Sequence, residues 1–584
     1  MNTQNTVLSE RAAFALRLFV GVAFGLLMAA FGRFGLFEAD GTSSAMWGLT
    51  GSKSLWQPIV YSTLALSVFI WWATAGTMKR SSLLIWGAVA SAVIAALALH
   101  QASSNANHTL YAFGAPFAWL VLPLLFVANE LVSSADRSGR LIAPYPVYFD
   151  QAWKHGVQLA LSLLFTGLFW GILWLGAALL SFIGFTWLRD LLGKDWFALP
   201  ASGAAMACAV QLGDVQDKLL VNVRALVLSV LSWLLPVIAA IGLLFLGSLC
   251  VSGLEPLWKT KAATTTLLAA SIAFVLLINA AYQQGDEERP VNIVMKWAAR
   301  LAAFLLLAFA GLATYSLWLR VNEYGLTTER VLAGAGTVIA LLFGLGYAAA
   351  AVWPGRWFSR LETVNIAMAF VKVVIFLGLL TPLADPSRLS IADQVARLQS
   401  GRTSLDRFDW RQLRFETGRY GMTALNTLTK AGKTADIRAA ATKTAALKDS
   451  ERWDMPAPFV PAQPDDMAKL KVVFPAGASL PATFTADDLS RSDLLDCVRD
   501  EKASCTAALI DLDGDGTAEI VVLKAHGTTT FTYDAGAWRP TRDDLIFMDD
   551  DEIKAFNAGK ITLKPHRWRD LIVDGKNVSD PSEN

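Results

Sequence analysis

The amino-acid sequence predicts a polytopic α-helical membrane protein with about eleven transmembrane helices and a small C-terminal α+β or mostly β soluble domain. Of the 584 residues, 54% are hydrophobic and 17% are charged, whereas soluble domains carry about 25% charged residues. Apolar runs of about twenty residues, enough to cross a hydrocarbon core of about 30 Å, recur as far as Leu383. Because backbone groups inside lipid must be satisfied within each segment, these runs predict a helical bundle.

The apolar runs are Ala12–Gly32, Pro58–Gly76, Leu83–Leu99, Leu110–Val132, Val157–Phe185, Phe197–Leu212, Leu226–Cys250, Ala262–Tyr282, Ala298–Leu319, Val331–Trp353 and Thr363–Leu383. Phe197–Leu212 is short and alanine-rich, so it is the doubtful span. If it spans and the N-terminus is cytoplasmic, the inner loops hold about fourteen basic residues and the outer loops about eight. If Phe197–Leu212 does not span, the loops on each side carry about eleven basic residues, and the asymmetry is lost. We therefore expect eleven spans and an extracytoplasmic C-terminal domain.

The composition divides the chain into four segments. We expect a transmembrane bundle over 1–384, a juxtamembrane helical segment over 385–448, a Pro-rich linker over 449–467 and an extracytoplasmic soluble domain over 468–584. Ser390 is placed to cap the first juxtamembrane helix, and the aromatic, arginine-rich stretch 405–428 fits a helix on the membrane surface or one packed against the protein. Strand-like runs LKVVF, TAALIDL, AEIVVLKA and TTTFTYD, with helices near Ser490–Asp500 and Asp550–Asn557, predict one small domain.

Polar residues inside the spans are the first candidate site. Lys372 lies near the middle of the last span, Asn365 two turns before it, and Asn279 late in the eighth span. A lysine at the bilayer centre costs about 2.5–3.5 kcal/mol, so Lys372 should face the bundle interior or water, or else extend along its helix to an interface. Arg17, near the inner end of its span, fits that second explanation. Glycines in two spans should allow close helix packing, and these are Gly167, Gly171, Gly176, Gly334, Gly336, Gly344 and Gly346.

An acidic loop in the C-terminal domain is the second candidate site. In DLDGDGTAE, Asp511, Asp513 and Asp515 alternate, Thr517 offers a carbonyl and Glu519 takes the ninth position. Calcium takes six or more oxygen ligands, which such a loop supplies. The loop lacks the EF-hand glutamate at position twelve and resembles the calcium loops of FG-GAP-type repeats. The alternative is an acidic turn with solvated carboxylates.

The four cysteines fall into two kinds. Cys208 and Cys250 lie alone in apolar runs and are expected to be small core residues. Cys497 and Cys505 lie close together in the polar tail, so they are a disulfide candidate if the tail is in an oxidising compartment.

Several segments carry a family resemblance. They are the stretch from WLLPVIAAIG to INAAYQQG, PYPVYFDQAWKHG, LRVNEYGLTTERV and FDWRQLRFETGRYG. They resemble the uncharacterised bacterial membrane family called domain of unknown function 4153, from the first span to about Gly421. The resemblance implies a bacterial cytoplasmic-membrane location and brings no activity or catalytic residues with it.

The sequence names no reaction. Neither a zinc helix, a phosphate loop nor a nucleophile elbow is present, so an enzyme is not favoured, and the near-zero net charge gives no indication of nucleic-acid binding. The first hypothesis is a transporter or handler of an anionic or lipid-linked substrate, with anionic lipid as a partner. The alternative is a non-catalytic membrane scaffold or sensor whose extracytoplasmic domain binds a partner. A polar cavity reaching Lys372 would favour the first.

Overall fold

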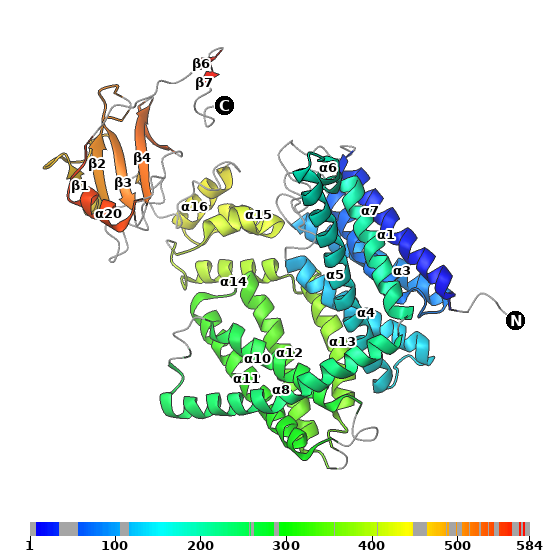
Figure 1. Cartoon of the computed structure of the whole chain (residues 1–584). Coiled ribbons are helices and arrows are strands. Elements are labelled where there is room, and N and C mark those ends of the chain that lie inside the picture. Colours follow the sequence, from blue (N-terminus) through cyan, green and yellow to red (C-terminus); the bar gives the residue numbers. More distant parts are fainter. Residues whose placement is uncertain are drawn as a thin grey trace. The chain divides into compact units, whose positions relative to one another are not determined.

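The structure of the chain is a computed structural model. It describes residues 7–33, 56–104, 116–215, 217–255, 257, 262–284, 291–354, 357–405, 407–447, 464–485, 488–489, 498, 505–512, 514–524, 527–534, 536–541, 548–562, 572–573 and 576–577. The chain forms two compact units, which we call the membrane unit (Met1–Asp393 with Thr417–Tyr420) and the C-terminal unit (Gln394–Glu416 with Gly421–Asn584) (Figure 1). The expected juxtamembrane segment 385–448 is therefore shared between the two.

The membrane unit is built from helices. They are α1 (Glu10–Arg33), α2 (Trp56–Thr74), α3 (Arg80–Ser104), α4 (Pro116–Ser138), α5 (Tyr145–Phe182), α6 (Trp187–Leu192), α7 (Asp195–Val215), α8 (Asp217–Ser252), α10 (Ala263–Tyr282), α11 (Ile293–Tyr324), α12 (Thr328–Val352) and α13 (Leu361–Leu379). Among the described residues, ten helices are long and apolar enough to cross a membrane, and α2 adds the shorter apolar helix Ile59–Thr74. The predicted fold class is confirmed. The doubtful run Phe197–Leu212 forms α7, one of the ten.

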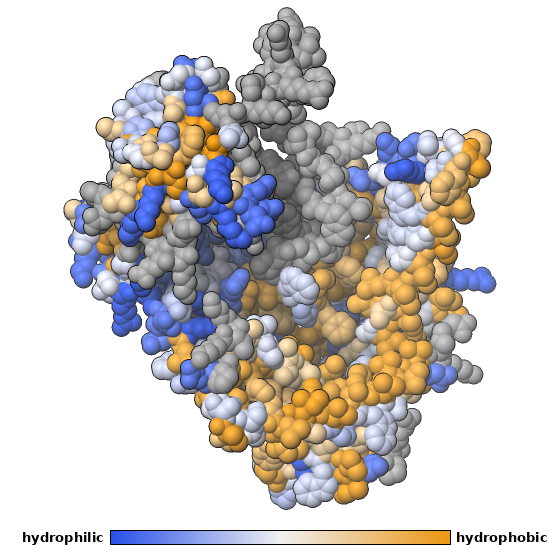
Figure 2. Space-filling model, turned by 60° about the vertical axis from the view of Figure 1, so that its left-hand side comes forward, coloured by the Kyte–Doolittle hydropathy of each residue, from blue (hydrophilic) through white to orange (hydrophobic). Residues whose placement is uncertain are grey.

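Helix α5 links two groups of helices. Its 38 residues make a helix of about 57 Å, longer than one bilayer crossing requires. Its first turns add Tyr145 and Phe149 to the core of α8 and α10–α13, while its side packs against α4 and α7. Farther along, Leu164, Leu168 and Ile172 are exposed, and Figure 2 shows broad apolar surface on the visible face of the molecule. Such a surface is suited to lipid.

Glycine serves helix packing at some of the predicted places. A Cβ at Gly344 of α12 would lie 2.8 Å from the Leu307 Cα of α11, so only glycine allows this approach. By contrast, Gly167 and Gly171 of α5 have nothing within 4 Å, and Gly176 meets only the tip of Leu188 at 4.0 Å. The prediction of a tight glycine face on α5 is therefore wrong within the described chain, because that face points away from the other helices.

The helices after the last span are α14 (Pro386–Ser400), η2 (Gln412–Glu416), α15 (Gly418–Ala431), α16 (Ala435–Ala446) and α17 (Pro464–Lys469). Ser390 does not cap α14: it lies inside the helix and donates to the Leu326 carbonyl at 3.1 Å. The cap is Asp385, whose Oδ1 accepts from the amides of Ser387 (2.9 Å) and Arg388 (3.2 Å). The aromatic stretch that follows is packed in the protein and not available to a membrane surface, since Trp410 is 1% exposed.

The C-terminal unit contains a five-stranded sheet of order β1-β2-β3-β4-β5 and, after it, a two-stranded antiparallel sheet of β6 (Ile572–Val573) and β7 (Lys576–Asn577). The strands are β1 (Lys471–Phe474), β2 (Thr506–Ile510), β3 (Glu519–Lys524), β4 (Gly527–Asp534) and β5 (Ala537–Thr541), with β1 and β2 parallel and the other neighbours antiparallel. Alternate residues of β3 bury Val522 on one face and Val521 on the other. The second face is covered by α20 (Asp550–Asn557), the helix predicted at these residues, through Phe556. The helix predicted at Ser490–Asp500 lies mostly outside the described residues.

Candidate functional site

The first turns of α5 make polar contacts with several neighbouring helices of the membrane unit. The helix begins after Pro144 and has a proline in its first turn, where the backbone amide has no helical acceptor to lose. The segment YPVYFDQAWKH then supplies side chains to four separate polar clusters on the neighbouring helices. These side chains are Tyr145, Asp150, Gln151, Lys154 and His155.

The first cluster is a closed ring of hydrogen bonds. Tyr347 Oη donates to Asn365 Oδ1 (2.6 Å), Asn365 Nδ2 donates to Asn279 Oδ1 (2.6 Å), and Asn279 Nδ2 donates back to Tyr347 Oη (2.6 Å). Tyr145 Oη joins the ring, accepting from Asn365 at 3.2 Å and donating to Asn279 Oδ1 at 3.3 Å. Each amide uses both its oxygen and its nitrogen, so the ring ties α5, α10, α12 and α13 together as a structural element.

Lys372 is not part of that ring. The prediction grouped it with Asn365 and Asn279, and the structure brings the two asparagines together without the lysine. Its half-buried side chain extends toward α12, where Nζ lies 5.7 Å from the ring centroid of Phe343. Among the described residues, no carboxylate pairs with it. An ammonium over an aromatic face is stabilised modestly, by about 0.5–2 kcal/mol.

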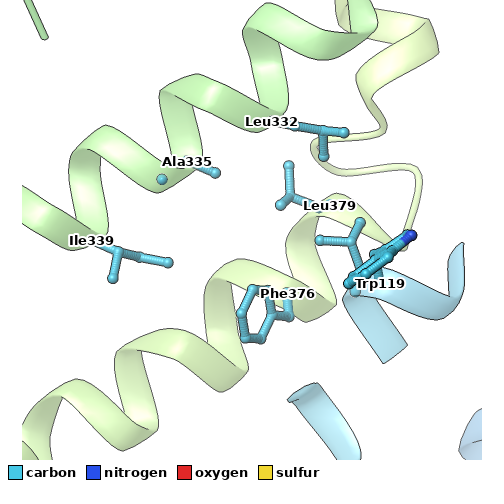
Figure 3. A pocket seen from close by; sticks show the side chains of 8 residues that line it. Trp119, Leu332, Ala335, Ile339, Phe376 and Leu379 are labelled. Carbon is cyan, nitrogen blue, oxygen red and sulfur yellow. The ribbon is translucent and has the colours of Figure 1, made fainter. Parts of the chain in front are cut away.

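An apolar recess of about 470 Å³ lies between α4, α12 and α13. Figure 3 shows Leu332, Ala335 and Ile339 facing Phe376 and Leu379, with Trp119 beside Leu379. Trp119 is 76% exposed, so the recess is open at that side. Lys372 is not among the residues that line the recess, and it lies about one turn before Phe376 on the same face of α13.

A buried histidine and glutamate meet between α4 and α5. His155 Nδ1 lies 2.7 Å from Glu130 Oε1, and both residues are 6% exposed. Asn129 Nδ2 donates to the same carboxylate at 3.3 Å. The distance is typical of a charge-assisted hydrogen bond, so this is a close acid–base pair inside the membrane unit.

Arg17 is buried and paired, and the expectation that it extends to an interface is wrong. It is 1% exposed and donates to the carbonyls of Trp72 (3.0 Å) and Ala75, to Gln211 Oε1 (2.7 Å) and to Asp214 Oδ2 (2.5 Å). On its other oxygen Asp214 accepts from Gln158 (3.1 Å) and pairs with Lys154 (3.4 Å). The acid on α7 compensates the buried guanidinium, so no interface is needed.

A second histidine–carboxylate pair joins α3 to the start of α14. His100 Nε2 lies 2.9 Å from Asp385 Oδ2, and Arg419 Nη2 lies 3.2 Å from His100 Nδ1. Arginine can only donate, so Nδ1 is the acceptor and Nε2–H donates to the aspartate. Both ring nitrogens are therefore engaged.

The acidic loop of the C-terminal unit is closed by its own backbone. Asp511 accepts from the amides of Gly514 (2.7 Å) and Gly516 (3.1 Å), Asp515 from Thr517 (2.6 Å), and Glu519 from Leu512 (2.7 Å). Asp513 lies outside the described residues. Among the described residues no group of three or more acidic, histidine or cysteine side chains is arranged to hold a metal, so calcium binding stays a prediction.

The cysteines differ from expectation in one respect. Cys208 and Cys250 are free and exposed, not core residues, because they lie on outward faces of α7 and α8. Cys505 is disulfide-bonded. Cys497 lies outside the described residues, so the Cys497–Cys505 pairing stays a prediction.

The sequence did not predict two of these ion pairs, because their members are far apart along the chain. Glu130 and His155 are 25 residues apart, and Arg17 and Asp214 are 197 apart. One signal was available: an acid in an apolar run needs a partner, and Glu130 is such an acid.

Comparison with known proteins gives a family and no relatives of known role. The family described as Domain of unknown function (DUF4153) matches residues 60–417. This range holds α5 and the polar clusters described above, apart from Arg17, Arg419 and the C-terminal loop. No curated protein and no solved structure gave a significant match.

Proposed function

The chain belongs to the family Domain of unknown function (DUF4153), and we propose that this integral membrane protein binds and moves an anionic amphiphile along the seam between α12 and α13. The apolar chain of the substrate would occupy the recess between α4, α12 and α13. Its anionic group, such as a lipid phosphate, would contact Lys372. The observation that carries the proposal is an ammonium that has no carboxylate partner in the described part of the chain and lies one helical turn from an apolar recess.

The recess suits an acyl or isoprenoid chain. Every residue lining it is apolar, and they are Trp119, Leu120, Leu332, Ala335, Gly336, Ile339, Phe376 and Leu379. Burying apolar surface gains about 25 cal/mol per Å² relative to water, although a lipid tail would only exchange one apolar surrounding for another. The recess therefore supplies shape and position, and the affinity must come from a polar contact.

That contact is available at Lys372. Its ammonium is half-buried, and only the Phe343 ring faces it among the described residues. An ammonium held inside a bundle without a carboxylate favours a mobile anion. A charge-assisted hydrogen bond contributes about 1.5–3 kcal/mol, which corresponds to roughly tenfold or more in affinity.

The test compares the wild-type chain with Lys372→Met, extracted together with native lipid. Met retains most of the apolar stem, so the fold should persist while co-purifying anionic lipid, quantified by mass spectrometry, falls roughly tenfold. Lys296→Met is the matched control, since Lys296 also lies over an aromatic ring, that of Trp357 at 5.9 Å, and does not line the recess. Its lipid content should equal that of the wild type.

A second variant separates the recess from the charge. Ala335→Trp fills the recess and leaves Lys372 in place, so it should also reduce the bound lipid. If both Lys372→Met and Ala335→Trp retain wild-type lipid, the transport proposal fails and the scaffold or sensor alternative is favoured.

We also propose that the protein lies in the bacterial cytoplasmic membrane with its N-terminus inside and residues 468–584 outside. The support is the excess of basic residues in the loops assigned to the inside. An alkaline phosphatase reporter fused after Asn584 should be active, and a reporter active only in the cytoplasm should be silent. The opposite pattern would rule out this orientation.

A further inference from the structure

Helices α4 and α5 form a second polar seam, separate from the apolar recess. One face of α4 carries Glu130, Ser133, Ser134 and Arg137, which are spaced three or four residues apart. Two cross-links join this face to α5. Glu130 meets His155 at 2.7 Å, and Arg137 Nη1 donates to Gln151 Oε1 at 3.3 Å. Ser133 and Ser134 fall between the two cross-links.

The seam contains an unusual number of buried polar atoms without a protein partner. Within the described chain, no hydrogen bond reaches Glu130 Oε2, His155 Nε2, the hydroxyls of Ser133 and Ser134, or Gln151 Nε2. All five side chains are more than nine-tenths buried. Leaving one such group unsatisfied costs about 1–3 kcal/mol. Five of them in one seam indicate a place that receives water or a polar ligand.

The charge of the pair identifies the ligand. With Nδ1–H of His155 donating to an ionised Glu130 Oε1, the remaining ring nitrogen, Nε2, is the one without a protein hydrogen bond in the described chain. With a neutral imidazole the pair carries one uncompensated negative charge in a buried position, which is costly. A proton added to Nε2 produces an imidazolium beside a carboxylate and removes the net charge. This protonation leaves the hydrogen bond between His155 Nδ1 and Glu130 Oε1 in place.

We propose that Glu130 and His155 form a proton-binding site, at which a proton from water in the α4–α5 seam adds to His155 Nε2. The proton is the ligand, the imidazole is the acceptor, and the carboxylate supplies the counter-charge. The proposal holds whatever occupies the apolar recess. It gives the membrane unit a titratable group that could drive movement of a substrate by a proton gradient.

Among the other charged groups on α4, α5 and the helices packed against them, Lys372 of α13 faces the Phe343 ring, and the following groups make hydrogen bonds or ion pairs. Each has its own partner on α4, α5 or the helices packed against them: Asp136 accepts from the Lys79 amide and Ser82, Arg137 donates to Gln151, Lys154 and Arg17 pair with Asp214, Asp150 accepts from Arg224 and Gln284, and Glu362 accepts from Tyr282. Glu130 is the charged group in direct contact with His155, at 2.7 Å.

The experiment uses the full chain in lipid nanodiscs with ¹⁵N-labelled histidine. The chain has five histidines, and the His155 signals are those missing from His155→Asn, in which the amide can still donate to Glu130. Between about pH 8 and pH 5, where imidazole ordinarily titrates, Nδ1 should stay protonated and Nε2 should change from unprotonated to protonated. In Glu130→Gln, Nε2 should stay in one state over this range, because a neutral amide does not balance an imidazolium.

His100 is the internal control. Its two nitrogens are engaged by Asp385 and Arg419, so its signals should not follow those of His155. An Nε2 signal of His155 that is unchanged over the whole range would overturn the proposal. So would a signal that responds to sodium concentration at constant pH and not to pH, since that would identify a metal cation as the ligand.

Discussion

Arg17 and Lys372 are both cations within helices of the membrane unit, and their surroundings are opposite. Arg17 is 1% exposed and donates to two carbonyls, an amide oxygen and a carboxylate. Lys372 is half-buried, and only an aromatic ring faces it among the described residues. Both sit in apolar runs that look alike in sequence. The difference teaches that the partner, and not the depth of the residue, separates a structural cation from a candidate binding cation.

The same distinction applies to the two histidine–carboxylate pairs. The pair at His100 uses both ring nitrogens, whereas the pair at His155 leaves one free. The Asn279–Asn365–Tyr347 ring belongs with the first kind, because every amide group in it is used. Clusters in which every polar atom has a hydrogen-bond partner stabilise the bundle. Clusters with buried polar atoms that lack a partner are candidate ligand sites.

The largest effect expected from this comparison is on stability. Arg17→Met removes the buried member of the pair and leaves Asp214, whose side chain is 19% exposed, with Lys154 and Gln158. Breaking a buried ion pair costs about 3–5 kcal/mol. Lys372→Met removes a charge that has no carboxylate partner among the described residues, so it should leave stability unchanged or raise it. Denaturant unfolding of the two variants in detergent measures both. Equal destabilisation by the two substitutions would contradict this contrast between Arg17 and Lys372, because it would mean that Lys372 also has a structural partner.

The second prediction extends the comparison to the C-terminal unit. The carboxylates of Asp511 and Glu519 are satisfied by backbone amides, so a calcium ion must add to an already closed loop. If it does, calcium at a hundredfold excess over its Kd should stabilise this unit by about 2.7 kcal/mol. Calorimetry of the full chain with calcium or chelator measures the shift.

Asp513→Ala should abolish that calcium effect. Asp534→Ala, an acidic residue at the end of β4 and outside the loop, should retain it. A transition that does not respond to about millimolar calcium would leave only the solvated acidic turn as the explanation of the loop.

The fold could be predicted because its signals are local. Hydropathy over about twenty residues marks each span, and period-two patterns marked the strands that became β2, β3 and β4. The site could not be predicted in the same way. The sequence singles out Asn365 and Asn279 as polar groups in spans, but their partner Tyr347 is a residue type that gives no signal there. The His155 pair depends on how α4 and α5 pack, which no single run encodes.

The smallest expected effect concerns two glycines, one packed against a neighbouring helix and one with open space beside it. A Cβ at Gly203 of α7 would run into the Gly21 carbonyl of α1, and a Cβ at Gly21 would lie 2.6 Å from the Gly203 oxygen. Gly203→Ala should therefore cost about 1–3 kcal/mol, as overpacking does. The same substitution at Gly167, where nothing lies within 4 Å, should stabilise α5 by up to about 1 kcal/mol, because alanine is the better helix former. Thermal unfolding of the two variants measures both changes in stability, which should have opposite signs. A loss of stability in Gly167→Ala would show that this face of α5 is covered in the membrane, either by another copy of the chain or by a different protein.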